Sequence, residues 1–339
     1  MRRRDFLRQL ACMAALINYP HTVKALETNS TEKWQSAQAL PLRLQEIYPA
    51  AHNGRLYIAG GIAARWGIPY FTNRCISYDP VEDSWREEAE LPENLHHAAL
   101  VSTGERLFLI GGFNGAYTHI WKMRSSVYEL TESGWQPCGH LPQPQAEGVV
   151  SKAPDGSVHI VTGQSPLGQA NSSRTDHREV KHHYRWDVDN QKQTAQWQQL
   201  APIPTARNSA TGGWVDNQLI ITGGRTAQGN LSATEIYDPD DDRWRKASPL
   251  PLPQAGLASV TVNDGIIVFG GEMFTPKEQV FGNVWRYSLS QDRWTSLPSL
   301  PTPRHGLGAV RFNNRIHVVG GATNPSGSGT SDVNEVLIL

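Results

Sequence analysis

The chain is poor in cysteine and lacks long apolar or like-charged runs. It has three cysteines in 339 residues, and 31 Lys and Arg nearly balance 32 Asp and Glu, for a net charge of −1. Because no basic patch or charge run stands out, we expect neither nucleic acid nor an anionic membrane surface as a partner. No apolar segment reaches the ~20 residues of a membrane-spanning helix, so we expect no integral membrane segment.

The N-terminus is typical of a twin-arginine export signal. Residues 2–8 read RRRDFLR, a short apolar run follows over residues 10–17, and Ala25 offers a small residue before a cleavage point. We therefore expect a signal peptide over residues 1–25, a mature chain over 26–339 and a location in the periplasm. The alternative is a basic N-terminal arm.

Removal of this leader would leave Cys75 and Cys138. The periplasm is oxidising and permits disulfides. The two cysteines fall in different repeats of the sequence, however, and pairing requires close Cα atoms. We therefore expect two separate thiols.

Six tryptophans recur at a fixed distance before a glycine pair. The spacing is 26 residues in five repeats and 27 in the third, where Thr162-Gly163 replaces the pair. The tryptophans are Trp34, Trp85, Trp135, Trp197, Trp244 and Trp294, and the other pairs begin at Gly60, Gly111, Gly223, Gly270 and Gly320. A constant period of this kind indicates a repeat architecture.

Each repeat of about fifty residues predicts four antiparallel strands. A strand of small residues and an apolar strand flank a short turn such as Asn53-Gly54 or Asp264-Gly265, and the second strand ends in the glycine pair. A third strand follows after a variable loop, and the tryptophan lies on a fourth, outer strand. The chain resembles kelch-repeat β-propellers from Trp34 to Leu339. The resemblance implies an all-β fold, a six-bladed kelch-type β-propeller.

Ring closure follows from the strand count. The last repeat ends at Leu339 with no outer tryptophan strand, whereas Trp34 precedes any inner strand. We therefore expect the Trp34 segment to be the outer strand of the last blade, which closes the ring and leaves no open sheet edge.

Two positions in each repeat should face the central funnel: the start of the innermost strand and the residue after the glycine pair. They carry charged and amide groups, as a polar, multi-hydroxyl or carboxylate ligand would require. The candidate ligand-binding residues are Arg207, Arg225, Arg304, His305, Glu147, His97, Gln164 and Asn208. The competing interpretation is structural, because an arginine or histidine at the start of an inner strand can bond backbone carbonyls.

Gly270-Gly271-Glu272 also resembles a motif of the bacterial sialic acid mutarotases, which are periplasmic six-bladed kelch propellers. By that resemblance Glu272 would be the proton acceptor, with an arginine holding the sugar carboxylate. In that family the glutamate falls on a different blade.

The longest insertion, residues 164–184, holds His177, His182 and His183. A metal site there is conceivable, but a solvated charged loop is the interpretation we adopt, so we expect no metal and no cofactor.

Three functions follow. The first is a monomeric exported propeller that binds a small polar ligand, a sugar or acidic sugar, in its funnel. The second is a carbohydrate mutarotase or epimerase with Glu272 as base. The third is a scaffold that binds protein partners through its loops.

Overall fold

The structure, a computed structural model, describes residues 33–116, 119–188 and 195–339. The expected signal peptide over residues 1–25 lies outside these ranges. The described part is built from strands, with one 3-10 turn at Arg174–Asp176. It contains no apolar helix of the length that a lipid bilayer would require.

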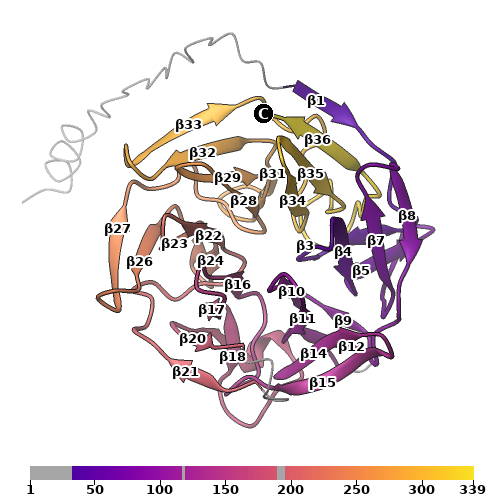
Figure 1. The fold of residues 1–339 in the computed structure, drawn as a ribbon, viewed down its shortest axis with the longest axis horizontal. Coiled ribbons are helices and arrows are strands. Elements are labelled where there is room, and N and C mark those ends of the chain that lie inside the picture. Colours follow the sequence, from indigo (N-terminus) through magenta and orange to yellow (C-terminus); the bar gives the residue numbers. More distant parts are fainter. Residues whose placement is uncertain (1–32, 117–118, 189–194) are drawn as a thin grey trace, which may run out of the picture. The chain divides into compact units, whose positions relative to one another are not determined.

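Six four-stranded antiparallel sheets lie around a common centre, as the repeat predicts (Figure 1). We number them as blades, from the innermost strand outward. Blade 1 is β3 (Ala50–His52), β4 (Arg55–Ala59), β7 (Cys75–Asp79) and β8 (Ser84–Glu87). Blade 2 is β10 (Ala99–Ser102), β11 (Leu107–Ile110), β14 (Ser126–Thr131) and β15 (Gly134–His140). Blade 3 is β16 (Val149–Lys152), β17 (Val158–Val161), β20 (His183–Trp186) and β21 (Trp197–Gln199).

The remaining three blades repeat the same order. Blade 4 is β22 (Thr211–Val215), β23 (Gln218–Thr222), β26 (Thr234–Asp238) and β27 (Arg243–Ala247). Blade 5 is β28 (Ala258–Val262), β29 (Gly265–Phe269), β32 (Val284–Ser288) and β33 (Arg293–Leu297). Blade 6 is β34 (Gly308–Phe312), β35 (Arg315–Val319), β36 (Asn334–Ile338) and, outermost, β1 (Lys33–Ser36).

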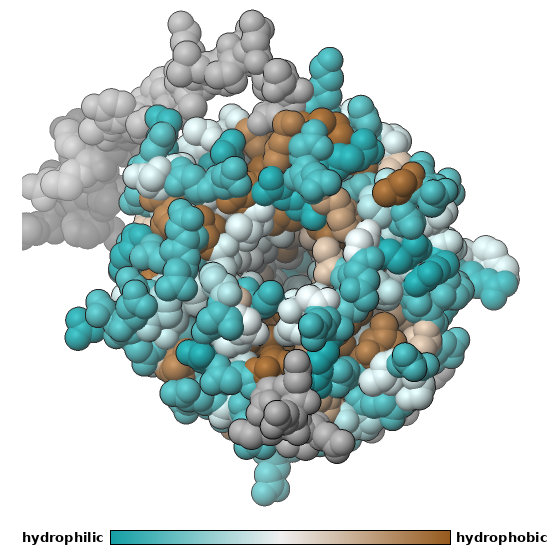
Figure 2. Space-filling model, viewed as in Figure 1, coloured by the Kyte–Doolittle hydropathy of each residue, from teal (hydrophilic) through white to brown (hydrophobic). Residues whose placement is uncertain are grey.

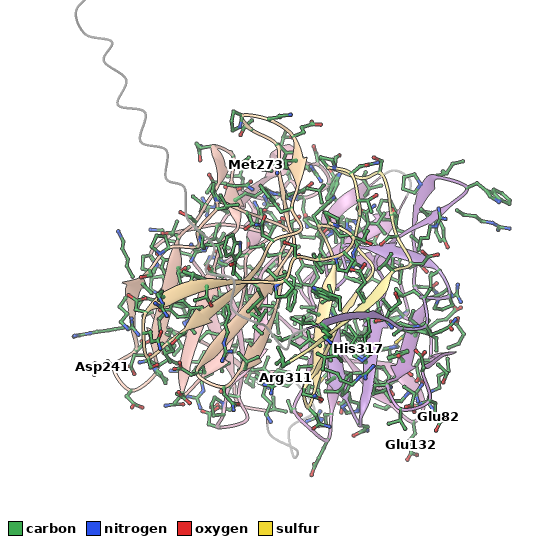
Figure 3. All side chains as sticks on the ribbon, turned by 90° about the horizontal axis from the view of Figure 1, so that it is seen from above. Glu82, Glu132, Asp241, Met273, Arg311 and His317 are labelled. Carbon is green, nitrogen blue, oxygen red and sulfur yellow. The ribbon has the colours of Figure 1, made fainter. Side chains whose placement is uncertain are left out.

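Short extra strands cover one face of the ring. They pair as β2 (Arg43–Gln45), β5 (Ile62–Arg65) and β6 (Ile68–Phe71); β9 (Leu95–His96), β12 (Phe113–Ala116) and β13 (His119–Met123); β18 (Gln164–Pro166) and β19 (His177–Glu179); β24 (Arg225–Thr226) and β25 (Gly229–Asn230); β30 (Glu272–Met273) and β31 (Gln279–Val280). Figure 3 shows Met273 of β30 at this face and Glu82 and Glu132, which lie in turns, at the opposite face.

The N-terminal strand lies at the outer edge of the last blade, where the strand count predicts it. β1 pairs antiparallel with β36, with Trp34 opposite Leu337. The Trp34 indole Nε1 also donates to the carbonyl of Pro298, at the end of blade 5, over 3.0 Å. This pairing gives blade 6 its fourth strand and covers an edge that would otherwise offer unpaired backbone groups.

The repeated tryptophans join neighbouring blades. In five repeats the indole Nε1 donates over 2.8–3.0 Å to a backbone carbonyl four residues after the preceding tryptophan of the repeat. The donors are Trp34, Trp85, Trp135, Trp244 and Trp294. Each ring thus fills space between blades and fixes them with a directed bond.

The glycine pairs serve the same purpose nearer the axis. In all six blades the second glycine donates its N–H, over 2.7–3.0 Å, to a carbonyl at the entry of the next blade, as Gly61 does to Leu95 and Gly321 to Leu44. A Cβ on Gly60 would lie 2.2 Å from the Leu95 oxygen, and its φ is +72°. Glycine is needed here because both the backbone conformation and the approach of the next blade exclude a side chain.

Candidate functional site

A ring of six residues in left-handed backbone conformation surrounds the axis. Glu46, His97, Glu147 and Ser209 have φ between 52° and 56°, and Gly256 and Gly306 occupy the same position in blades 5 and 6 with φ of 67° and 56°. We call these six the axial ring. Five of the six consecutive pairs, all except His97 and Glu147, are joined by backbone hydrogen bonds of 2.7–3.2 Å, for example Glu46 N–H to the carbonyl of Gly306.

Three positions of the axial ring carry ionisable side chains although glycine would fit the backbone there. Glycine adopts φ near +60° without cost, whereas other residues lose about 1–2 kcal/mol. Blades 5 and 6 use glycine, so the backbone bonds alone do not require the larger residues. The backbones of Glu46, His97 and Glu147 are therefore strained, and the strain is retained because of what these side chains contact. Strained residues of this kind are typical of functional sites.

The side chains form a polar circuit that passes through every blade. Its contacts are Arg225 to Glu272 (2.6 Å), Glu272 to His305 (3.4 Å), His305 to Glu46 (3.7 Å), Glu46 to His97 (3.0 Å), His97 to Glu147 (3.3 Å) and Glu147 to Ser209 (3.3 Å). The two ends of this series, Ser209 and Arg225, both belong to blade 4. The funnel therefore holds three carboxylates, one guanidinium and two imidazoles.

His97 lies between His96 and two carboxylates. The His96 Nε2 lies 2.7 Å from the carbonyl oxygen of Ile120, so it carries a hydrogen, and its Nδ1 lies 2.6 Å from the His97 Nδ1. The His97 Nε2 faces Glu46 at 3.0 Å and Glu147 at 3.3 Å. Burial, reinforced by the charge of His97, holds the pKa of His96 well below its usual value.

The charges also set the state of Glu46 and Arg225. Burial alone would raise the pKa of Glu46, but His97, with smaller contributions from His305 and Arg225, holds it well below its usual range. Burial opposes the charge of Arg225, but Glu147, Glu272 and Glu46 together raise its pKa. Both groups are therefore ionised.

A cavity of about 370 Å³ opens above this circuit, on the face that carries the short extra strands. Polar walls come from Glu46, His97, Arg225 and Glu272, together with Gln45, Arg174, Ser326 and Gly327, and apolar walls from Ile62, Trp121 and Phe274. We call it the mouth cavity. The Arg174 guanidinium lies 3.9 Å from the centre of the Trp121 ring, and that of Arg225 lies 5.1 Å from the centre of Phe274. Figure 2 shows a central hollow in the ring surface.

Two predicted ligand residues are structural, and this is a correction. Arg207 and Arg304 are 0% exposed and do not line the mouth cavity. Arg207 bonds Glu235 at 2.6 Å, and Arg304 bonds Glu335 at 2.8 Å and the Gly320 carbonyl at 2.6 Å. They point into their own blades because their position precedes the axial ring by two residues. Hence the prediction that they share a cavity with Glu272 and Arg225 is wrong.

The same entry position is structural in other blades. Gln254 donates to the carbonyl of Gly270 at 2.7 Å, and Gln145 donates to that of Thr162. These amides, like the Arg304 guanidinium, donate to a carbonyl of the left-handed turn at the end of the second strand. The structural interpretation therefore explains this position.

The other predicted residues lie at or beside the funnel. Glu272 and Arg225 line the mouth cavity, as does His97, whereas His305 and Glu147 complete the circuit beneath it. Asn208 donates to Glu179 at 3.0 Å, and Gln164 reaches the same oxygen at 3.4 Å. These last two residues extend the circuit toward the insertion in blade 3.

His177, His182 and His183 do not form a metal site. His183 is buried in blade 3 and bonds the ring of His159 at 2.8 Å, and His177 packs against Phe113. Across the ranges that the structure describes, no three metal-ligating side chains converge. Cys75 and Cys138 are buried and do not form a disulfide with each other.

Sequence reasoning missed several cavity residues. Trp121 lies in β13, Arg174 in the 3-10 turn, and Phe274 and Ser326 in loops, all in segments between the repeated strands where the repeat gives no register. Glu46 does follow from the repeat, because it lies at the start of the innermost strand, fourteen residues before Gly60, where later repeats hold Gly256 and Gly306.

Comparison with known proteins agrees with the fold. The family model of the KLHDC2/KLHL20/DRC7 kelch-repeats domain matches residues 168–321, and the kelch motif matches residues 49–92. The chain belongs to the kelch-repeat family. It is 26% identical over 264 residues to the Kelch-like protein terF of Aspergillus terreus. The matched region covers 74% of this chain and 56% of that protein.

Other kelch-repeat relatives are longer still. The chain is 28% identical to the Kelch repeat and BTB domain-containing protein 12 of Danio rerio, over 50% of this chain and 28% of the relative. It is 27% identical to Beta-scruin of Limulus polyphemus, over 51% of this chain and 18% of the relative. The chain thus spans less than two thirds of the length of each of these relatives.

Proposed function

We propose that this kelch-repeat protein binds a small polyhydroxylated ligand, a carbohydrate, in the mouth cavity. The observation that carries the proposal is the combination, in one cavity of about 370 Å³, of ionised side chains from several blades with the aromatic rings of Trp121 and Phe274. Carboxylates accept hydrogen bonds from sugar hydroxyls, and aromatic rings pack against the apolar faces of sugar rings. Cavities of this size with a few convergent polar groups are typical ligand sites.

The contacts of Glu272 favour binding over catalysis. Its Oε1 accepts from Arg225 at 2.6 Å, and its Oε2 accepts from the backbone N–H of Ser326 at 2.9 Å. A proton acceptor needs a lone pair directed at the substrate, whereas these bonds hold both carboxylate oxygens in a fixed position. The geometry therefore supports a positioning role for Glu272.

Isothermal titration calorimetry with a panel of neutral, basic and acidic monosaccharides tests the proposal. Phe274→Ala should weaken a bound sugar by about 1 kcal/mol, or roughly fivefold, through lost ring contact. Phe312→Ala is the matched control, since Phe312 is half-buried in β34 and outside the cavity. Equal losses in the two variants would place the ligand elsewhere, and a folded protein that binds no member of the panel would refute the proposal.

A scaffold for protein partners is the second candidate, favoured by the β5–β6 hairpin. Trp66 at its tip is 85% exposed and Ile68 is 67% exposed, and Trp66 has a φ of 52° that is costly for a bulky residue. The titrations distinguish the two functions, because a scaffold that uses this hairpin has no need of the mouth cavity.

A further inference from the structure

The insertion of blade 3, residues 164–184, reaches across to the neighbouring blade 2. The Asn171 side chain pairs with both backbone groups of Met123: its Oδ1 accepts from the N–H at 2.8 Å, and its Nδ2 donates to the carbonyl at 3.0 Å. Met123 belongs to β13, an edge strand of the β9–β12–β13 sheet, so Asn171 takes the place of a further strand. His177 packs against Phe113 of β12, with the ring centres 5.6 Å apart. The insertion is therefore fixed to blade 2 at both of these places.

The turn between Asn171 and His177 holds Arg174 in place. Ser173 caps the 3-10 turn Arg174–Asp176, and the Asp176 carboxylate accepts from the backbone N–H groups of Ser172 and Ser173 at 2.9 Å. The Arg174 guanidinium lies over the Trp121 ring of blade 2, 3.9 Å from its centre. A guanidinium that is already held in one position loses little conformational entropy when a ligand binds to it.

The N–H donors of Arg174 have no protein partner. Within the ranges that the structure describes, its guanidinium makes no hydrogen bond or ion pair and contacts the face of the Trp121 ring. The Arg225 guanidinium, which also lines the mouth cavity, is instead paired with Glu272 at 2.6 Å. Arg174 therefore brings to the cavity wall a fixed cation whose donors are available to a ligand.

We propose that Arg174 binds the ligand of the mouth cavity by donating hydrogen bonds to its oxygen atoms, and that Asn171 positions Arg174. The inference rests on the proposed carbohydrate function and adds to it a binding residue that no repeated strand supplies. Hydroxyl and carboxylate oxygens both accept from a guanidinium, so neutral and acidic sugars share this chemistry.

Calorimetric titration with the monosaccharide panel, which includes glucose, glucosamine and glucuronate, tests the role of Arg174. Arg174→Met keeps an unbranched side chain that can cover Trp121 and removes the donors, so affinity should fall about tenfold for the sugars that Arg174 contacts. A loss with neutral and acidic sugars alike assigns the contact to hydroxyl groups, and a loss confined to acidic sugars assigns it to the carboxylate. Arg178→Met is the matched control and should leave affinity unchanged, because Arg178 is exposed on the same insertion but does not line the cavity.

Two results would overturn the inference and leave the carbohydrate function standing. The first is unchanged affinity of Arg174→Met for every sugar that the unmodified protein binds. The second is an equal loss of affinity in Arg178→Met. Failure of the unmodified, folded protein to bind any member of the panel would refute the proposed function and the inference together.

Asn171→Leu tests the positioning role. The variant keeps the size of the side chain and removes both bonds to Met123, so affinity should fall about fivefold in a protein that remains folded. In the Arg174→Met background, Asn171→Leu should cause no further loss, because residues that act through one another have non-additive effects. Losses that add in the double variant would contradict a role of Asn171 through Arg174.

Discussion

Arg304 offers the sharpest test of the division between structural and ligand-binding residues. Its guanidinium is 0% exposed and donates to Glu335 at 2.8 Å, to the Gly320 carbonyl at 2.6 Å and to the Val318 carbonyl at 3.3 Å. Burial lowers its pKa to about 10, yet it stays charged at neutral pH. Arg304→Ala leaves the Glu335 carboxylate buried without its partner, so we expect a loss of about 3–5 kcal/mol in the free energy of unfolding.

Urea unfolding at pH 7 measures this loss, and calorimetric titration on the folded variant measures ligand affinity. We expect low stability with affinity within about twofold of the parent protein. The double variant Arg304→Gln, Glu335→Gln should recover most of the stability, because blades 3 and 5 carry glutamine at the same position and the charged partner is then removed. Unchanged stability together with lost affinity would refute the structural role and return Arg304 to the funnel.

Three further predictions concern the ring as a whole. Deleting residues up to 39 removes β1 and the Trp34 bond to blade 5, so the melting temperature should fall sharply, whereas deleting residues 1–25 should change it little; equal melting curves would exclude β1 as the closing strand. Trp244→Ala should cost about 3 kcal/mol, since it removes a ring packed between blades and its bond to a carbonyl, while the exposed Trp66→Ala should cost far less in the same urea titration. Burial lowers the pKa values of His159, to about 4, and of its hydrogen-bonded neighbour His183, so both are neutral in the folded state. Their contribution to the free energy of unfolding is complete above pH 6.5 and is lost as pH falls toward 4, because the histidines of the unfolded chain bind protons at a higher pH than those of the folded chain. The free energy of unfolding of His159→Gln should therefore depend less on pH in this range. An unchanged pH dependence would contradict the assignment.

The repeat made the fold predictable. A tryptophan, a turn and a glycine pair recur because each blade meets its neighbours in the same way, and the same bond recurs at Trp85 and Trp294. The place of the N-terminal strand was equally predictable, because the last repeat lacks an outer strand and the Trp34 segment is the one outer strand that no other repeat uses.

The site was predictable in part. Positions near the axis followed from the repeat register, and Glu272, Arg225 and His97 do line the mouth cavity. The register did not say which of two neighbouring residues points to the axis, and Arg304 was therefore assigned to the ligand. Loop residues such as Phe274 lie outside any repeat pattern, so only the folded structure shows that they line the mouth cavity.

Neighbouring residues at the start of each blade thus divide stability and function between them. In blades 3 to 6 the entry residue, for example Gln254 or Arg304, donates a hydrogen bond to a backbone carbonyl of its own blade, whereas blades 1 and 2 carry Leu44 and Leu95 at this position. The axial-ring residue two positions later needs only a left-handed backbone, which glycine supplies at Gly306 without strain. A charged residue at that position weakens the fold and is explained only by what its side chain does at the axis. Glu46 illustrates the point, because its carboxylate is ionised, lines the mouth cavity and lies 3.0 Å from the His97 Nε2.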